Sequence, residues 1–476
     1  MKKLKECKNF GELYYAIGDD NFSIIACFMA ILLVYAPLAA GVINYLMTVN
    51  SAYYDPYEYN YKCMTLWNII FTCMLIWFLV YFLGKIHNNE WGIKQLLKAV
   101  GEKQRWLLFW IALFVWTIIP VVCSCNPMGA MWGNTFLGSG YMSHLYMLGV
   151  MMCVYLINSK EQKEKLMWHF VISTDVLAMI MLAFEYQIPF LRIFTLASGV
   201  STYTNSNHYG YIIVMASLVI IGLYYTELNK DKNIRNQFKE TLCVVSLIIN
   251  IYALMINDTL GAYLAIVFTA ILIIPLWKIV TGKISWKHLV PLIIIVIFTL
   301  LSYNGFIVSV MGYSIGESLV VFIQDLFKVS HKSAGYKEAG TGRIALWLET
   351  IKRIWERPIV GYGPDIIVDT NNIPILSNTP HNEFLECAFF MGIPGLLLYL
   401  GGLIKLCIDK CKQLKNISLN ELIAAGVIIG YLASSFFGVR KFNTVCYFFM
   451  FIGILMRDEQ RKKEKKTKKQ KQRQRT

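Results

Sequence analysis

Residues 341–400 read TGRIALWLETIKRIWERPIVGYGPDIIVDTNNIPILSNTPHNEFLECAFFMGIPGLLLYL and form the only long polar excursion in a very apolar chain. Arg343 and Trp347 are four residues apart and therefore share one face of a helix. Arg357-Pro358 should end that helix, because proline removes a backbone donor and restricts the residue before it. The stretch predicts an amphipathic helix and a turn-rich loop that are held at one face of a membrane.

The rest of the chain supports this membrane setting. It has 476 residues, of which 56% are hydrophobic and only 16% charged, with a mean hydropathy of +0.49, whereas soluble domains carry roughly a quarter charged residues. Apolar runs of about 20 residues recur, each near the length that a bilayer requires. They predict an all-α polytopic bundle of about twelve transmembrane helices in a single membrane domain, residues 1–476. The expected spans are Phe22–Met47, Met64–Leu83, Trp106–Val122, Tyr141–Ile157, Met167–Phe184, Tyr209–Tyr225, Thr241–Ile256, Ala262–Trp277, Leu289–Tyr303, Phe389–Ile408, Glu421–Phe437 and Thr444–Met456.

The net charge of +15 follows this topology. Lysine and arginine gather in alternate connections between the spans, so the positive-inside rule puts both termini in the cytoplasm. Residues 304–388 then form one large external loop with amphipathic helices. We expect the tail 457–476 to be a disordered basic cytoplasmic segment, a solvated anchor in contact with membrane lipid. Without interleaved aromatic residues, we expect no nucleic-acid partner.

Metal and cofactor sites are not expected. The twelve cysteines are scattered, and most lie inside apolar runs as small hydrophobic residues. Cys63 could pair with Cys123 or Cys125 only in an oxidising compartment. No cysteine or histidine spacing resembles a zinc site, and Asp365 and Asp369 are too scattered for a metal site.

Histidine is the first candidate for acid–base chemistry. Of the seven histidines, the topology puts His144 and His208 at outer ends of spans, and His331 and His381 in the external loop. His331 lies in a polar stretch that indicates a mobile segment. His381 lies between a polar spacer and an apolar run. Thr379-Pro380 before it also fits an ordinary helix start, with Thr379 as the N-cap, and such a start would offer free backbone N–H groups to an anion.

Arg343 is the first candidate for binding phosphate. With Trp347, Ile351 and Ile354 it forms a stripe along one face of a helix that would lie on the membrane surface. A guanidinium binds phosphate oxygens two at a time. The alternative is a solvated charge, which is the usual state of an arginine in a loop.

The order of these residues resembles the signature loop of the O-antigen ligase and O-antigen polymerase superfamily. The matching positions are Arg343, Trp347, Pro358, Gly361, Gly363, His381, Asn382, Leu385, Gly392 and Gly395. Asn205 and Asn207, before the sixth span, match an Asn-x-Asn element of the family, although an N-cap explains them equally well.

The resemblance implies a metal-independent, GT-C-like glycosyltransferase at the outer face of the bacterial cytoplasmic membrane. It would move a glycan from a polyprenyl-pyrophosphate carrier to a glycan or lipid-glycan acceptor. His381 and Arg343 would be catalytic, and the expected substrate contacts are Trp347, Asn382, Arg192, Asn205, Asn207, Arg440 and Lys441.

The chain departs from the family where many members have an arginine and it has Leu260. Many relatives also have an arginine before the fourth span, and residues 131–140 contain none. Arg192, Arg440 or Lys441 would substitute. Polymerase and ligase share the signature, and we favour a polymerase slightly.

A polysaccharide flippase or another transporter of about twelve spans is the alternative. Transporters place ionisable residues at mid-membrane, whereas these spans are nearly free of them. A membrane scaffold is a third reading, which the ordered motif disfavours.

Overall fold

The computed structural model describes residues 7–50, 56–88, 105–134, 137–186, 205–231, 233–308, 312, 314–332, 334–335, 339–340, 342–365 and 379–456. These residues form helices and no strand. The helices are α2 (Phe10–Ile17), α3 (Asp19–Asn50), α4 (Pro56–His87), α6 (Trp106–Val122), α7 (Pro127–Trp132), α8 (Tyr141–Tyr155), α9 (Lys160–Glu185), α10 (Ser206–Leu228), α11 (Gln237–Asn257), α12 (Leu260–Thr281), α13 (Val290–Tyr303), α14 (Ile315–Ser330), α15 (Arg343–Glu356), α16 (Glu383–Cys411), α17 (Leu419–Ser435) and α18 (Phe442–Met456), with short 3-10 turns at Trp286–Leu289 and Leu414–Asn416.

The all-α membrane class is confirmed. Each expected apolar segment coincides with a helix, from α3 to α18. Among the described residues, 8 helices are long and apolar enough to cross a membrane, and Trp106–Val122, Leu419–Ser435 and Phe442–Met456 are shorter apolar helices. Arg192 and the tail 457–476 lie outside the described residues.

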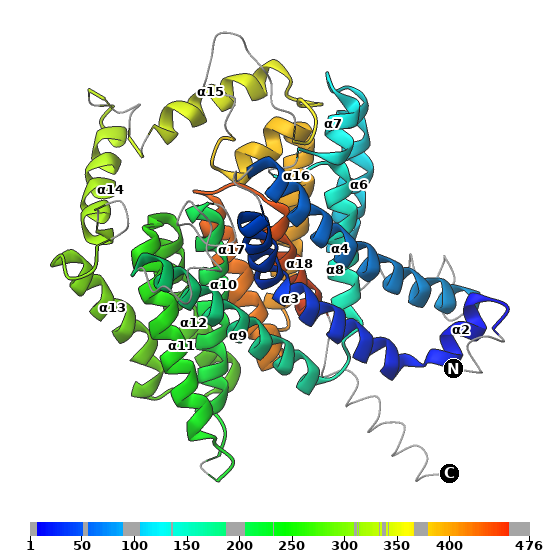
Figure 1. Ribbon diagram of the computed structural model, residues 1–476, viewed down its shortest axis with the longest axis horizontal. Coiled ribbons are helices and arrows are strands. Elements are labelled where there is room, and N and C mark those ends of the chain that lie inside the picture. Colours follow the sequence, from blue (N-terminus) through cyan, green and yellow to red (C-terminus); the bar gives the residue numbers. More distant parts are fainter. Residues whose placement is uncertain are drawn as a thin grey trace.

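Helix α10 forms the centre of the bundle (Figure 1). It is apolar all round, as a fully enclosed helix must be, and 94% of its most apolar 18-residue stretch is buried. Helices α9, α11, α12 and α17 pack around it. Glycine allows the closest approach, since a Cβ on Gly222 would lie 2.4 Å from the side chain of Ile423 in α17. Helix α10 is therefore held firmly among its neighbours.

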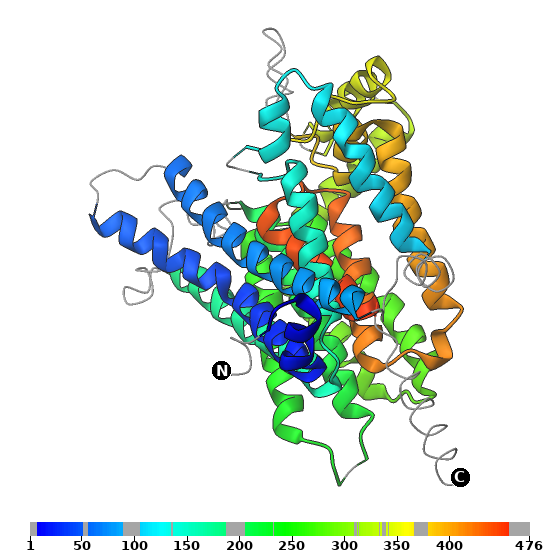
Figure 2. The same ribbon diagram turned by 90° about the vertical axis from the view of Figure 1, so that its right-hand side faces the viewer.

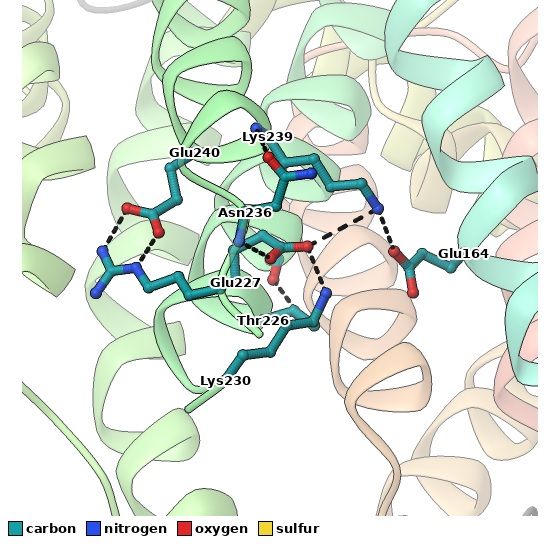
Figure 3. A network of polar contacts seen from close by, with 9 residues as sticks. Glu164, Thr226, Glu227, Lys230, Asn236, Lys239 and Glu240 are labelled. Atoms are coloured by element: carbon teal, nitrogen blue, oxygen red, sulfur yellow. Dashed lines mark hydrogen bonds and ion pairs between the residues drawn. The ribbon is translucent and has the colours of Figure 1, made fainter. Parts of the chain in front are cut away.

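A charged network closes one end of the bundle, where the lysine-rich connections meet (Figure 3). The buried carboxylate of Glu227 pairs with Lys230 at 2.6 Å and with Lys239 at 3.9 Å, and Lys239 reaches Glu164 of α9 at 3.2 Å. This network ties α9, α10 and α11 together. The opposite end carries α15 and α7 (Figures 1 and 2).

The segment 304–388 contains α14 and α15, and α16 begins within it at Glu383. Helix α15 ends at Glu356, directly before Arg357-Pro358, as the sequence predicts. Its buried residues are Leu346, Thr350 and Ile354. The expected stripe is wrong at Ile351, which is 40% exposed, because 3.6 residues per turn bring residue 350, not 351, onto the face of residues 343, 347 and 354.

Candidate functional site

The His-Asn turn begins α16 differently from the expectation. Asn382 is the N-cap, and its side-chain oxygen accepts hydrogen bonds from the backbone N–H groups of Phe384 and Leu385, each at 3.0 Å. The predicted cap at Thr379 is therefore wrong, because the Asn382 amide satisfies these free donors three residues later. His381 stands just before the helix in the left-handed region, with φ 49°. Its imidazole is held in a constrained turn, not on the helix itself.

Trp347 joins α15 to this turn. Its indole N–H donates to the carbonyl oxygen of Pro380 at 2.9 Å, and its ring lies 6.4 Å from that of Phe437. From the other side, the Asn382 amide donates to the Phe436 carbonyl at 3.2 Å. The spacing of Arg343 and Trp347 on one helix face thus brings Arg343 to the same side as His381.

Arg343, His381, His208 and Lys441 form a basic cluster. Burial lowers the pKa of His381, and the charge of Arg343 lowers it further. Burial also lowers the pKa of Arg343 and lowers the pKa of Lys441 to about 7. His208, which is 2% exposed in the first turn of α10, lies within electrostatic reach of both Lys441 and His381. The cluster therefore joins α10, α15, the His-Asn turn and the turn between α17 and α18.

The cluster is built for an anion. Arg343 is the charged group that lowers the pKa of His381, and burial lowers the pKa of Arg343 itself. The Nδ1 atoms of His208 and His381 are buried without a hydrogen-bond partner. Positive charge held away from water calls for a compensating anion, and buried polar atoms call for partners. A bound phosphate group would supply both the negative charge and the hydrogen-bond partners.

The two arginines that follow Arg343, one on α15 and one directly after it, are already engaged. Arg353 pairs with Glu349 and Glu356, both at 3.1 Å, and the guanidinium of Arg357 lies 5.0 Å from the centre of the Tyr362 ring. Arg343 is thus the arginine of this helix that remains for a ligand.

An apolar groove opens beside the basic cluster. It has a volume of about 420 Å³ between α12 and α17, and its lining consists of Gly261, Leu264, Ala265, Phe268, Ile429, Leu432, Ala433, Phe436 and Phe437. Phe436 contacts Asn382, and the ring of Phe437 lies next to that of Trp347. The groove therefore leads along two spans to the His-Asn turn.

The glycines of the motif serve backbone packing. The segment 358–363 runs against the start of α16, where Tyr362 and Gly363 donate to the carbonyls of Phe389 and Phe390 at 3.0 Å and Ile393 donates to that of Pro358 at 2.7 Å. A Cβ on Gly392, which has φ 70°, would lie 1.9 Å from the Ile359 carbonyl oxygen. The backbone of α16 is non-helical at Gly392, so the helix is kinked there.

Arg440 belongs to a second, acidic cluster. Its guanidinium lies 3.3 Å from His144 Nε2, and its backbone N–H donates to Glu386 at 3.4 Å. Two tyrosine hydroxyls, from Tyr399 and Tyr431, donate to Glu383 at 3.3 and 3.0 Å. The adjoining cavity of about 20 Å³ has room for about one water molecule. Arg440 thus balances buried carboxyls beside the basic cluster.

Asp365 fastens the end of the segment 358–365 near this acidic cluster. Its carboxylate accepts hydrogen bonds from the backbone N–H groups of Asn134 and Ser139 at 2.8 and 2.9 Å, and from the Asn134 amide. Burial nevertheless raises the pKa of Asp365 to about 7.

The structure brings most of the predicted residues together. Arg343, His381, Trp347, Asn382 and Lys441 meet around one site. Asn205 acts as the N-cap of α10 and accepts from the Asn207 N–H at 2.8 Å, which is the structural alternative for that motif.

Sequence reasoning missed His208 as a member of the site. Its available signal was its place directly after the Asn-x-Asn element, in the first turn of α10. Leu260 begins α12 next to Thr259, whose hydroxyl donates to the Ser206 carbonyl at 3.2 Å. At this same end of α10, His208 faces Lys441.

Residues 245–400 match a protein-family model described as O-antigen ligase. The matched region runs from α11 into α16 and includes the motif from Arg343 to Gly395. No curated protein matches the chain. The match covers about a third of the chain, and together with the signature residues inside it supports the resemblance to the O-antigen ligase and O-antigen polymerase superfamily.

Proposed function

We propose that the protein moves a glycan from a polyprenyl-pyrophosphate carrier to an acceptor hydroxyl at the outer face of the bacterial cytoplasmic membrane. The observation that carries this proposal is the half-buried pair of Arg343 and His381, next to an apolar groove between spans. A donor with an anionic head and a long apolar tail has the chemistry that fits both features. The acceptor is a glycan or a lipid-linked glycan.

Arg343 and Lys441 hold the donor's pyrophosphate in this scheme. A guanidinium offers two parallel donors to phosphate oxygens, and an ammonium adds a point charge. The polyprenyl tail occupies the groove of α12 and α17, so that the donor enters from the lipid. Basic side chains neutralise the phosphates, and the scheme requires no metal ion or cofactor.

His381 is the general base. The acceptor oxygen attacks the anomeric carbon of the donor sugar, its proton passes to His381, and the bond from that carbon to the pyrophosphate oxygen breaks. The electron pair leaves with the pyrophosphate, where Arg343 stabilises the developing charge. The lowered pKa of His381 keeps the imidazole neutral at neutral pH, as a proton acceptor must be.

Reconstitution tests this function directly. The purified protein in vesicles, given a lipid-linked oligosaccharide and an acceptor, should form new glycosidic bonds, and His381→Ala should not. A ladder of products spaced by one repeat unit identifies a polymerase, which we favour, whereas a single addition to a distinct acceptor identifies a ligase. Passage of the donor across the bilayer without a new bond would refute transfer and identify a transporter.

A further inference from the structure

Hydrogen-bonded links join three segments and α16 into a closed ring at the end of the bundle that carries the His-Asn turn. The segment 358–365 is bonded to α16 by three backbone hydrogen bonds of 2.7–3.0 Å. The connection between α17 and α18, residues 436–441, returns to the start of α16, where the Asn382 amide donates to the Phe436 carbonyl at 3.2 Å. Two further links, both made by the connection between α7 and α8, complete the ring.

One of these links joins the connection between α7 and α8 to the connection between α17 and α18. The hydroxyl of Ser139 donates to the Arg440 carbonyl at 3.1 Å. The Phe442 N–H, at the start of α18, donates to the Leu137 carbonyl at 3.0 Å. A Cβ on Gly138 would lie 2.8 Å from the Phe442 ring, so the two connections are in close contact.

The last link depends on one carboxylate. Asp365, at the end of the segment 358–365, accepts from the backbone N–H groups of Asn134 and Ser139 at 2.8 and 2.9 Å and from the Asn134 amide. It has φ 58°, a strained conformation that persists where the surrounding structure fixes it. A Cβ on Gly133 would lie 2.7 Å from the carboxylate. The other links each have bonds from at least two separate groups, whereas the three bonds of this link all end on Asp365.

We propose that Asp365 is a positioning residue, which closes this ring and thereby holds His381 where the proton of the acceptor is taken. This inference rests on the proposed function. His381 directly precedes Asn382, at which the ring meets the His-Asn turn. With φ 49°, His381 lies outside the helix, so the place of its imidazole depends on the tertiary contacts of that turn. Asp365 acts through the two connections and not on the reacting groups.

Asp365→Asn weakens the link with little effect on the backbone, because asparagine tolerates the left-handed conformation. The new amide keeps an oxygen for the two backbone N–H groups but turns its own NH2 group toward that of Asn134. Asn134 cannot rotate its amide without loss, since its oxygen accepts from the Leu137 N–H at 2.8 Å. In the reconstituted assay, kcat per folded molecule should fall by about 10-fold, because a misplaced catalytic group lowers the rate steeply.

Asn134→Asp in the same chain should restore kcat to within about 3-fold of the parent protein. The carboxylate then lies at position 134, where it accepts both from the amide at position 365 and from the Leu137 N–H. Asn134→Asp alone sets two carboxylates against each other and should also lower kcat. Two losses that cancel when they are combined indicate a direct contact between the two side chains.

Asp20→Asn is the matched control. The Asp20 carboxylate also accepts from an asparagine amide, that of Asn158 at 3.3 Å. This contact lies beyond the C-terminal end of α8, whereas Asp365 bonds to the connection before its N-terminal end. Asp20→Asn should therefore keep kcat.

The reactivity of His381 toward diethyl pyrocarbonate reports its position without depending on glycan transfer. His381 is half-buried, and His331 is exposed. In detergent-solubilised protein, mass spectrometry should show faster modification of His381 in Asp365→Asn than in the parent, and the parent's rate again when Asn134→Asp is added. His331 should react equally in all of these proteins. Ser139→Ala breaks a bond of the neighbouring link and should change kcat and the reactivity of His381 in the same directions, so the test does not depend on one variant folding.

The positioning role is overturned if kcat per folded molecule and the reactivity of His381 stay unchanged in Asp365→Asn and Ser139→Ala. A loss of kcat that Asn134→Asp does not recover contradicts it as well, and so does a lower amount of folded protein as the only effect. Failure of the proposed function has a different signature. The parent protein would then form no glycosidic bond, while the reactivity of His381 would still follow the bond between residues 134 and 365.

Discussion

His381 has the geometry and the charge environment of a base that works at neutral pH. Burial and Arg343 lower its pKa below the ordinary 6.5, and a protonated imidazole cannot accept a proton. We therefore expect kcat/KM to rise with pH through a value below 6.5. At pH 7 the protonation of His381 should no longer limit kcat/KM. Lys441, whose pKa lies at about 7, loses its charge as the pH rises, so donor binding should weaken above that value. The deprotonation of His381 and the loss of charge on Lys441 together give a bell-shaped pH profile. It can be measured as the initial rate of glycan transfer at each pH.

The variants of His381 sharpen this test. His381→Ala should lower kcat by about 10²–10⁴-fold, the range for loss of a general base, and should remove the acid limb of the profile. His331→Ala is the matched control, because His331 is an exposed imidazole at the end of α14, and it should keep both rate and profile. An acid limb that survives in His381→Ala would assign the base elsewhere.

Arg343 is expected to act through its shape as well as its charge. Arg343→Lys keeps one positive charge and loses the planar pair of donors, so glycan transfer should fall by about 100-fold while the amount of inserted protein stays the same. Arg353→Lys provides the control, since Arg353 lies on the same helix in ion pairs with Glu349 and Glu356. Near-normal product from Arg343→Lys would reduce this arginine to a solvated charge.

At the scale of single residues, the sequence predicts those that belong to a motif of fixed spacing. Arg343, Trp347, His381 and Asn382 stand in a fixed order inside one polar stretch, and the structure brings them together. Asp365 lies in a turn-rich stretch where an aspartate usually faces solvent, and only the three-dimensional structure shows its bonds to the connection between α7 and α8. Arg440 is a residue whose place the sequence predicts incorrectly. In a short turn it is expected to contact substrate, but it is only 7% exposed and contacts His144 and Glu386.

Among the elements, the contact between the segment 358–363 and α16 depends on Gly392. A left-handed residue with a side chain costs about 1–3 kcal/mol, and here the added Cβ also meets the Ile359 carbonyl oxygen at 1.9 Å. Gly392→Ala should therefore lower the thermal stability of the detergent-solubilised protein by more than this strain alone. The clash should also shift the His-Asn turn and reduce transfer.

Gly305→Ala separates the two costs. Gly305 has a similar φ of 74° but nothing within 4 Å of an added Cβ, so this variant reports the strain without the clash. Heat-induced aggregation, followed at one heating rate for both variants and the parent, gives the comparison. Equal losses would show that the contact with residue 359 adds nothing to stability.

The start of α16 shows why element boundaries escape sequence reasoning. Thr379-Pro380 and Asn382-Glu383 both fit the pattern of a helix start, and local preference does not separate them. The choice is made by tertiary contacts, since the Pro380 carbonyl bonds to Trp347 and the Asn382 amide bonds to Phe436. The helix consequently begins after the histidine and leaves it in a turn.

At the scale of the whole molecule, hydropathy predicts the helices but not their arrangement. Every expected span is a helix, because a run of about 20 apolar residues has few other stable states in a bilayer. The central place of α10 was not predicted, since nearly all spans are equally apolar. It follows from close contacts at glycines such as Gly222, which a single sequence does not reveal.

The last prediction concerns orientation, for which the bundle offers two well-separated ends. The lysine-rich connections meet at the end closed by Glu227 and Lys239, and the positive-inside rule places that end in the cytoplasm. Lys328 of α14 and Lys412, just after α16, are exposed, and we expect them on opposite sides. With Cys7, Cys73, Cys123, Cys125, Cys407 and Cys411 replaced by serine to lower the background, a membrane-impermeant maleimide should label Lys328→Cys in intact cells.

Lys412→Cys should react only after the membrane is opened. The protein with the six serine replacements and with Lys328 and Lys412 unchanged is the blank. Both variants must retain glycan transfer, so that the labelled protein is the folded one. The reverse labelling pattern would show the opposite orientation and would place the basic cluster of Arg343 and His381 in the cytoplasm. A carrier-linked glycan at the outer face could not then reach it, so this single measurement also decides where the proposed reaction takes place.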